Sequence, residues 1–108
     1  MNKLLLAVLM AAMAGTAQAR GNAEAGKAKA AQVCAACHGP DGNQPSAPDQ
    51  PILAGQYADY LAKALHDYKT GKRNNPIMKG FAAQLSKQDM EDLAAWFSGQ
   101  KSRLHDQR

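Results

Sequence analysis

The sequence predicts an all-α fold with three main helices joined by long loops. Three segments carry apolar residues at intervals of three and four, the spacing that keeps them on one face of a helix. No stretch of the chain alternates apolar and polar residues, as a half-buried β-strand would. The five prolines lie outside these three segments, where the chain is expected to form loops.

The first nineteen residues are predicted to be a cleaved signal peptide. Lys3 precedes an apolar run from Leu4 to Ala14, and a small-residue Ala-Gln-Ala pattern at 17–19 follows. A membrane anchor is the alternative, but a run of about eleven residues is well short of the roughly 20 that a spanning helix needs. We therefore expect one exported domain over residues 20–108, without stable membrane insertion.

The first helix of this domain is expected over Ala23–Val33, with Asn22 as its N-cap. The segment from Gly39 to Gly55 carries four of the prolines and is too broken for regular structure. A loop of this length is uncommon in a compact domain unless it has a function. We therefore expect the loop to serve a site.

The second helix is expected over Tyr57–Thr70, and Gly71 ends it. Large apolar side chains fall on one of its faces, namely Tyr57, Leu61, Leu65 and Tyr68. Basic residues gather where the helix ends, and we interpret this cluster as a solvated helix terminus: Lys69, Lys72 and Arg73.

The segment at residues 72–85 is expected to be a loop because Pro76 and Gly80 interrupt it. The last helix begins at Ser86, where Asp89 follows at the spacing of a capping box, and it runs to Ser98. Its buried face is predicted to hold Met90, Leu93, Ala94 and Phe97, with Trp96 beside them.

The chain holds two cysteines, in the motif Cys34-Ala-Ala-Cys37-His38. Cys-x-x-Cys-His is the attachment signal for a c-type haem. Two thiols three positions apart can each reach one vinyl group of the same porphyrin, and the next residue can then direct its imidazole to the iron. An exported domain of this size has a marginal core, which a covalent cofactor would supplement.

Three other uses of this motif remain open at this point. A thioredoxin-type dithiol should follow a strand, and none is expected. A structural zinc site needs four ligands, and His66, His105 or a carboxylate would have to complete it at no recognisable spacing. A structural disulfide would close only a very short loop and would therefore stabilise the fold little.

A six-coordinate haem iron also needs a distal ligand. Met78 lies between Pro76 and Gly80, and a loop can carry such a side chain over the haem. Its alternative role is to cap the core. Met90 falls on the apolar face of the last helix, where methionine usually fills the core, and His66 has charged neighbours that favour a solvent-facing position.

Several motifs together resemble the small bacterial class I cytochromes c, namely CAACHG, PILAGQYADYLAKALHDYKTGKR, NPIMKGFAAQL and DLAAWF. The chain looks most like the single-haem periplasmic carriers that are related to each half of the two-haem cytochromes. The resemblance covers nearly all of residues 20–108 and fades beyond Gly99. It implies a class I cytochrome c fold, with three main helices and long loops wrapped around one covalently bound haem.

The resemblance also implies roles for individual residues. Cys34 and Cys37 match the thioether positions of haem c, and His38 and Met78 match the proximal and distal iron ligands. Pro51 matches the proline whose carbonyl accepts a hydrogen bond from the ligand histidine. Two further residues match the crossing of the first and last helices: Gly26 and Trp96.

These expectations favour a periplasmic single-electron carrier over an enzyme, because a His/Met iron has no free position for a substrate. The expected partners are a quinol-oxidising complex as donor and a terminal oxidase or reductase as acceptor, in transient complexes with a monomer. The alternative is a haem-binding subunit, ligand sensor or peroxidase. Residues 20–108 carry twelve basic and nine acidic residues, without the basic blocks and interleaved aromatics that would indicate nucleic-acid binding.

Overall fold

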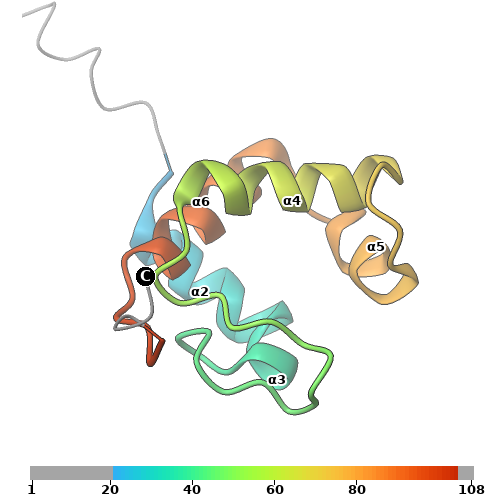
Figure 1. Cartoon of the computed structure of the whole chain (residues 1–108). Helices are drawn as coiled ribbons and strands as arrows, with labels where there is room; N and C mark the ends of the chain where they lie inside the picture. Colours follow the sequence, from blue (N-terminus) through green and yellow to red (C-terminus); the bar gives the residue numbers. More distant parts are fainter. Residues whose placement is uncertain (1–20, 105–108) are drawn as a thin grey trace, which may run out of the picture.

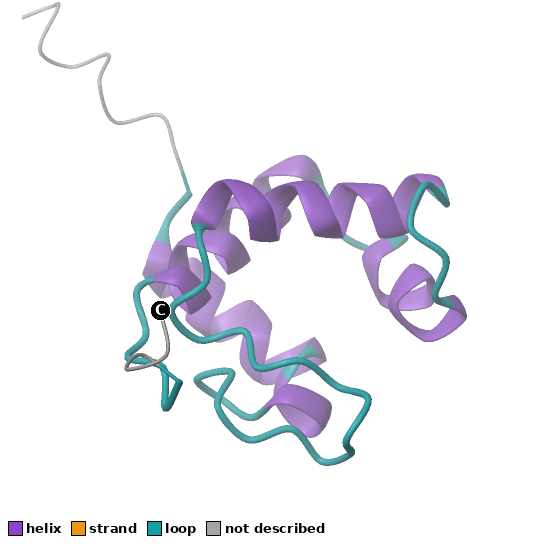
Figure 2. Ribbon diagram, in the orientation of Figure 1, coloured by secondary structure: helices purple, strands orange, loops and turns teal. Residues whose placement is uncertain are grey.

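The computed structural model describes residues 21–104, so the predicted signal peptide at 1–19 lies outside the described residues. Within this range the chain forms helices and loops and contains no strand (Figures 1 and 2). The helices are α2 (Ala23–Val33), α3 (Ala35–His38), α4 (Ala58–Thr70), α5 (Pro76–Ala82) and α6 (Lys87–Ser98). The all-α prediction is confirmed. None of the helices in this range is long and apolar enough to cross a membrane.

Helices α2 and α6 cross at very close range. A β-carbon added at Gly26 would overlap the carbonyl oxygen of Asp92, and one added at Gly21 would overlap that of Glu91. The backbone N–H of Asn22 donates to Asp92 Oδ1 at 2.7 Å, between residues 70 positions apart. The predicted crossing at Gly26 is therefore confirmed, and Gly21 extends it.

Trp96 also lies at this crossing, half-buried on α6. Its Cβ is among the nearest atoms to the position of a Gly26 β-carbon. The indole Nε1–H donates to the Pro40 carbonyl at 3.0 Å, and the Lys27 ammonium lies 5.5 Å from the centre of a Trp96 ring. Trp96 thus joins α2, α6 and the turn that follows α3.

The core is built around α6, which packs against α2 on one side and α4 on the other. All four side chains predicted to be buried on α6 are buried. They form one cluster with residues of α2, α4 and the α5–α6 link: Ala30, Leu61, Leu85, Met90, Leu93, Ala94 and Phe97. In Figure 1, α5 lies at the far end of α4, and α3 lies with α2 on another side of the molecule.

Two helices were not predicted from the sequence. The segment at 72–85 contains α5, which begins at Pro76 and is capped by the Asn75 side chain. Proline suits the first turn of a helix because its missing N–H has no intrahelical partner there, whereas we had interpreted it with Gly80 as an interruption. The second is α3, a single turn separated from α2 by a break at Cys34.

The second helix begins one residue later than predicted. Tyr57 is its N-cap and is 75% exposed, so it does not belong to the buried face. Leu61 is buried, and Leu65 and Tyr68 are half-buried. Gly71 ends the helix in the left-handed conformation, with φ of 84°.

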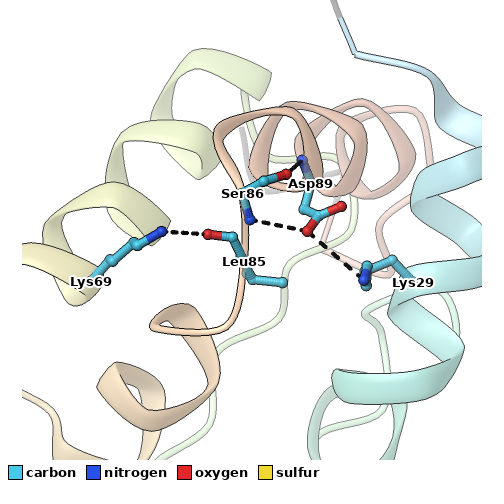
Figure 3. A network of polar contacts seen from close by, with 5 residues as sticks. All are labelled: Lys29, Lys69, Leu85, Ser86 and Asp89. Atoms are coloured by element: carbon cyan, nitrogen blue, oxygen red, sulfur yellow. Dashed lines mark hydrogen bonds and ion pairs between the residues drawn. The ribbon is translucent and has the colours of Figure 1, made fainter.

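The predicted capping box is present at the start of α6 (Figure 3). The Asp89 backbone N–H donates to Ser86 Oγ, and the Ser86 N–H donates to Asp89 Oδ2, each at 3.0 Å. Lys29 of α2 lies 3.8 Å from Asp89 Oδ2, and Lys69 of α4 donates to the Leu85 carbonyl at 2.6 Å. The link before α6 is therefore tied to α4 through Leu85, and the first turn of α6 is tied to α2 through Asp89.

Candidate functional site

The centre of the molecule holds a cavity of about 420 Å³. Its wall is mostly apolar and receives side chains from every helix and from the long loop between α3 and α4. The residues of the motifs singled out from the sequence lie on this wall together: Cys34, Cys37, His38, Pro51 and Met78. Other lining residues are apolar side chains of α4, α5 and α6, including Leu61, Leu65, Phe81, Leu93 and Phe97.

The break between α2 and α3 positions the two cysteines. Cys34 is the residue at the break, and Cys37 lies in the single turn of α3 that follows. Both are half-buried free thiols. Burial, and to a lesser extent the neighbouring Cys37, raises the pKa of the Cys34 thiol to about 11. A redox dithiol relies on a lowered thiol pKa, so this environment argues against the thioredoxin-type interpretation.

The imidazole of His38 is held in one orientation. Its side chain is buried, and Nδ1 lies 3.0 Å from the Pro51 carbonyl oxygen. A carbonyl can only accept, so Nδ1 carries the proton and the lone pair resides on Nε2. Ligand histidines in metal sites are commonly fixed by such a bond. The long loop therefore supplies the hydrogen-bond partner of Nδ1 and leaves Nε2 of His38 as the ring nitrogen that could bind a metal.

Met78 reaches the cavity from α5, a different element from the one that carries His38. Asn75 fixes the start of this helix, because its side chain accepts from the backbone N–H groups of Ile77 and Met78, both at 3.1 Å. Met78 is half-buried. Of the two rival ligands weighed from the sequence, Met90 is buried in the core cluster and His66 is exposed, and neither lines the cavity.

The described residues contain no group of three or more His, Cys, Asp and Glu side chains that could hold a metal ion. A structural zinc site over residues 21–104 is therefore not supported. The cavity fits a large apolar cofactor instead, since it has apolar walls, two thiols on one edge and an oriented imidazole.

The three residues of the basic cluster after α4 are all exposed, as interpreted from the sequence, but two of them make further contacts. Lys69 makes the hydrogen bond to the Leu85 carbonyl, and Arg73 lines the cavity. Lys72, exposed like the other two, does not line the cavity. The position of Arg73 in the same short segment as Met78 is the sequence signal that could have indicated its place.

In the described residues, helices surround an apolar cavity, and a Cys-x-x-Cys-His motif lies on the cavity wall. These features place the chain in the class of proteins that bind a c-type haem. The family described as cytochrome c matches residues 23–101, and this chain belongs to it. Its fold is the class I cytochrome c fold, and its cofactor is haem c bound covalently.

Known relatives agree with this assignment. The chain is 54% identical over 102 residues to cytochrome c4 of Pseudomonas aeruginosa, covering 94% of this chain and 50% of that protein. It is 44% identical over 72 residues to a thiosulfate dehydrogenase electron acceptor of Stutzerimonas stutzeri, covering 67% and 33%. The crystal structure of reduced cytochrome c4 from Pseudomonas stutzeri superposes with a TM-score of 0.69 at 49% identity, covering 76% and 47%. The chain thus spans about half the length of these cytochrome c4 relatives.

Proposed function

We propose that this chain is a periplasmic single-electron carrier, formed by a cytochrome c domain over residues 20–108. Cys34 and Cys37 would hold its single haem through thioether bonds, and His38 and Met78 would ligate the iron. The observation that carries the proposal is the cavity itself, because these four side chains meet on its apolar wall. When bound there, the haem accepts and returns one electron.

His38 contributes an imidazole whose orientation is fixed before any metal binds. His38 Nδ1–H donates to the Pro51 carbonyl oxygen at an N···O distance of 3.0 Å, which directs the Nε2 lone pair away from the loop. This bond also makes Nε2 a better electron donor. Because the imidazole is buried, it would undergo little solvent reorganisation when an electron is transferred.

Met78 contributes a neutral thioether. A methionine ligand and an apolar surrounding both favour the reduced iron and raise the reduction potential. If His38 and Met78 both ligate the iron, no coordination site would be left for a substrate. This supports a carrier and argues against a ligand sensor or peroxidase.

Partner proteins would dock where the cavity wall reaches the surface. Ile77 is 69% exposed, Tyr60 50% and Phe81 40%, and all three line the cavity. An exposed apolar rim of this kind suits a small, transient interface. We propose a quinol-oxidising complex as donor and a terminal oxidase or reductase as acceptor, with the chain acting as a monomer. The thiosulfate dehydrogenase electron acceptor among its relatives makes attachment to an enzyme the second candidate.

The ligation is tested by the Met78→Leu variant of the oxidised holoprotein. We expect it to lose the weak red absorbance band of methionine-ligated ferric haem and, once reduced, to bind carbon monoxide. The matched control is Met90→Leu, which changes a buried methionine outside the cavity and should keep the band. Carbon monoxide binding by the reduced unmodified protein would contradict the proposal.

The location and the mode of partner binding have separate tests. Cell fractionation should recover the holoprotein in the periplasmic fraction, with residue 20 at its N-terminus. Electron-transfer rates to an isolated partner should fall only modestly with added salt, because the rim is apolar and the net charge is small. Stable copurification with a dehydrogenase would favour the subunit alternative.

A further inference from the structure

Charged side chains are rare on the wall of the cavity. Of its lining residues within the described part of the chain, Arg73 is the only lysine or arginine and Asp49 the only carboxylate. The family's cofactor, haem c, carries two propionate carboxylates besides its apolar ring. A carboxylate next to an apolar wall needs a charged or hydrogen-bonding partner to offset its lost hydration.

Arg73 is held in place from two sides. Its backbone N–H donates to the Asp67 carbonyl at 2.9 Å, which anchors the turn after α4. Its guanidinium carbon lies 4.8 Å from the centre of the Tyr68 ring, a cation–π contact with another lining residue. Among residues 21–104, no carboxylate forms an ion pair with Arg73. Its hydrogen-bond donors are therefore available to a carboxylate in the cavity.

The neighbouring cation behaves differently. Lys72 and Arg73 are both exposed and adjacent in the chain, but only Arg73 lines the cavity. The Asp67 carboxylate is engaged by Lys63, at 2.6 Å. Only Arg73 of this basic cluster combines a positive charge with a place on the cavity wall.

We propose that Arg73 binds a propionate of the haem, with Tyr68 orienting the guanidinium. This inference rests on the proposed haem site. Arginine suits the role because its planar fork can donate two parallel hydrogen bonds to one carboxylate. The pair places a fixed positive charge beside the haem, which disfavours the ferric form and raises the reduction potential.

The test compares Arg73→Gln with Lys72→Gln in the holoprotein. Each variant removes one positive charge, but only the first removes it from the cavity wall. We expect Arg73→Gln to lower the midpoint potential and to shift the propionate bending bands in the resonance Raman spectrum. Lys72→Gln should leave the bands in place and change the potential much less. Equal effects of the two variants, or unmoved bands in Arg73→Gln, would overturn the proposal.

If Arg73→Gln does not accumulate as holoprotein, Arg73→Lys decides the question. It keeps the charge but loses the fork, so the propionate bands should still shift, and unchanged bands would refute a direct contact. The red band of the unmodified protein separates this proposal from the previous one. If the red absorbance band is absent from the unmodified protein, the result counts against Met78 ligation. If that band is present but the propionate Raman bands do not move in the Arg73 variants, the result counts against the Arg73 contact alone.

Discussion

Two regions of the molecule are held together by different means. One is the crossing of α2 and α6, and the other is the pair of helices α4 and α5 over residues 58–82, which we call the arm. At the crossing, glycines bring two backbones into contact. In the arm, α5 packs against α4 but has Ala82 as its one buried residue, and Ile77 and Phe81 are exposed. The crossing is a direct contact between protein backbones, whereas one side of the arm faces the cavity. The arm therefore depends on what fills the cavity.

The largest effect should follow from preventing cofactor attachment. In a Cys34→Ala, Cys37→Ala double variant, we expect the arm to lose most of its amide hydrogen-exchange protection, because α5 then has little apolar surface to pack on. The crossing should retain more protection than the arm. Hydrogen exchange followed by mass spectrometry of peptides from residues 72–85 and 87–98 measures this difference, and equal loss in both would show that the two regions form one cooperative unit.

The next effect concerns the crossing itself. Gly26→Val places a side chain where the Asp92 carbonyl lies, and we expect it to lower the free energy of unfolding by about 3 kcal/mol, at the upper end for overpacking. The matched control is Gly80→Ala in α5, where a β-carbon meets nothing within 4 Å. Because alanine suits a helix interior better than glycine, this control should be neutral or stabilise by about 0.5 kcal/mol. Denaturant unfolding of both holoproteins gives the comparison.

A smaller effect is expected where the arm is tied to the rest of the fold. Lys69→Met removes the 2.6 Å hydrogen bond to the Leu85 carbonyl while keeping most of the side-chain length. A hydrogen bond from a charged donor contributes roughly 1.5 kcal/mol, and its loss should also free the end of the segment that carries Met78. Imidazole should then displace Met78, the proposed distal ligand, at a lower concentration, as followed by the red band. Lys63→Met is the control, because an exposed ion pair such as Lys63–Asp67 contributes little to stability and this pair lies away from the link.

The smallest effect belongs to the capping box. The Ser86 backbone N–H, followed by the Ser86 hydroxyl and Lys29, lowers the pKa of Asp89 below its usual value. Since the folded pKa is lowered, the stabilisation is present above the ordinary Asp pKa of about 3.9 and is lost as pH falls through the folded value. Asp89→Asn should therefore reduce the melting temperature slightly at pH 7 and flatten its fall below about pH 4.

A double-mutant cycle with Ser86→Ala checks the origin of this effect. If the two side chains act through one capping box, the Asp89→Asn and Ser86→Ala changes should be less than additive. Additive losses, with an unchanged slope in acid, would show that Asp89 acts elsewhere.

Local signals in the sequence predicted the crossing better than the arm. Asn22 and Ser86 with Asp89 are caps that act within four residues, and Gly26 was identified through the family resemblance. Helix α5 was not predicted for two reasons. Pro76, with which it begins, was interpreted as an interruption, and Gly80 lies in its interior. These residues are compatible with a helix only in the presence of the Asn75 cap and of packing on α4.

The candidate site also contains features that local sequence patterns predict and features that depend on tertiary contacts. The Cys-x-x-Cys-His spacing is a local pattern, so its chemistry could be proposed directly. The places of Lys69 and Arg73 could not, because the first depends on a carbonyl sixteen positions away and the second on a cavity that exists only in the folded chain. Long flexible side chains at a helix end look alike in sequence, and tertiary contacts distinguish them.

The hydrogen bond between Asn22 and Asp92 closes a long segment of the chain into a loop. It joins residues 70 positions apart. The cavity-lining residues that lie between Asn22 and Asp92 in the sequence therefore belong to one large closed loop. The entropy of closing such a loop grows only with the logarithm of its length, about 0.6 kcal/mol for each doubling. A few residues added to the surface turns between α3 and α4 would hardly weaken the crossing. The enclosed stretch can therefore change in size while the two helices that close it keep their contact.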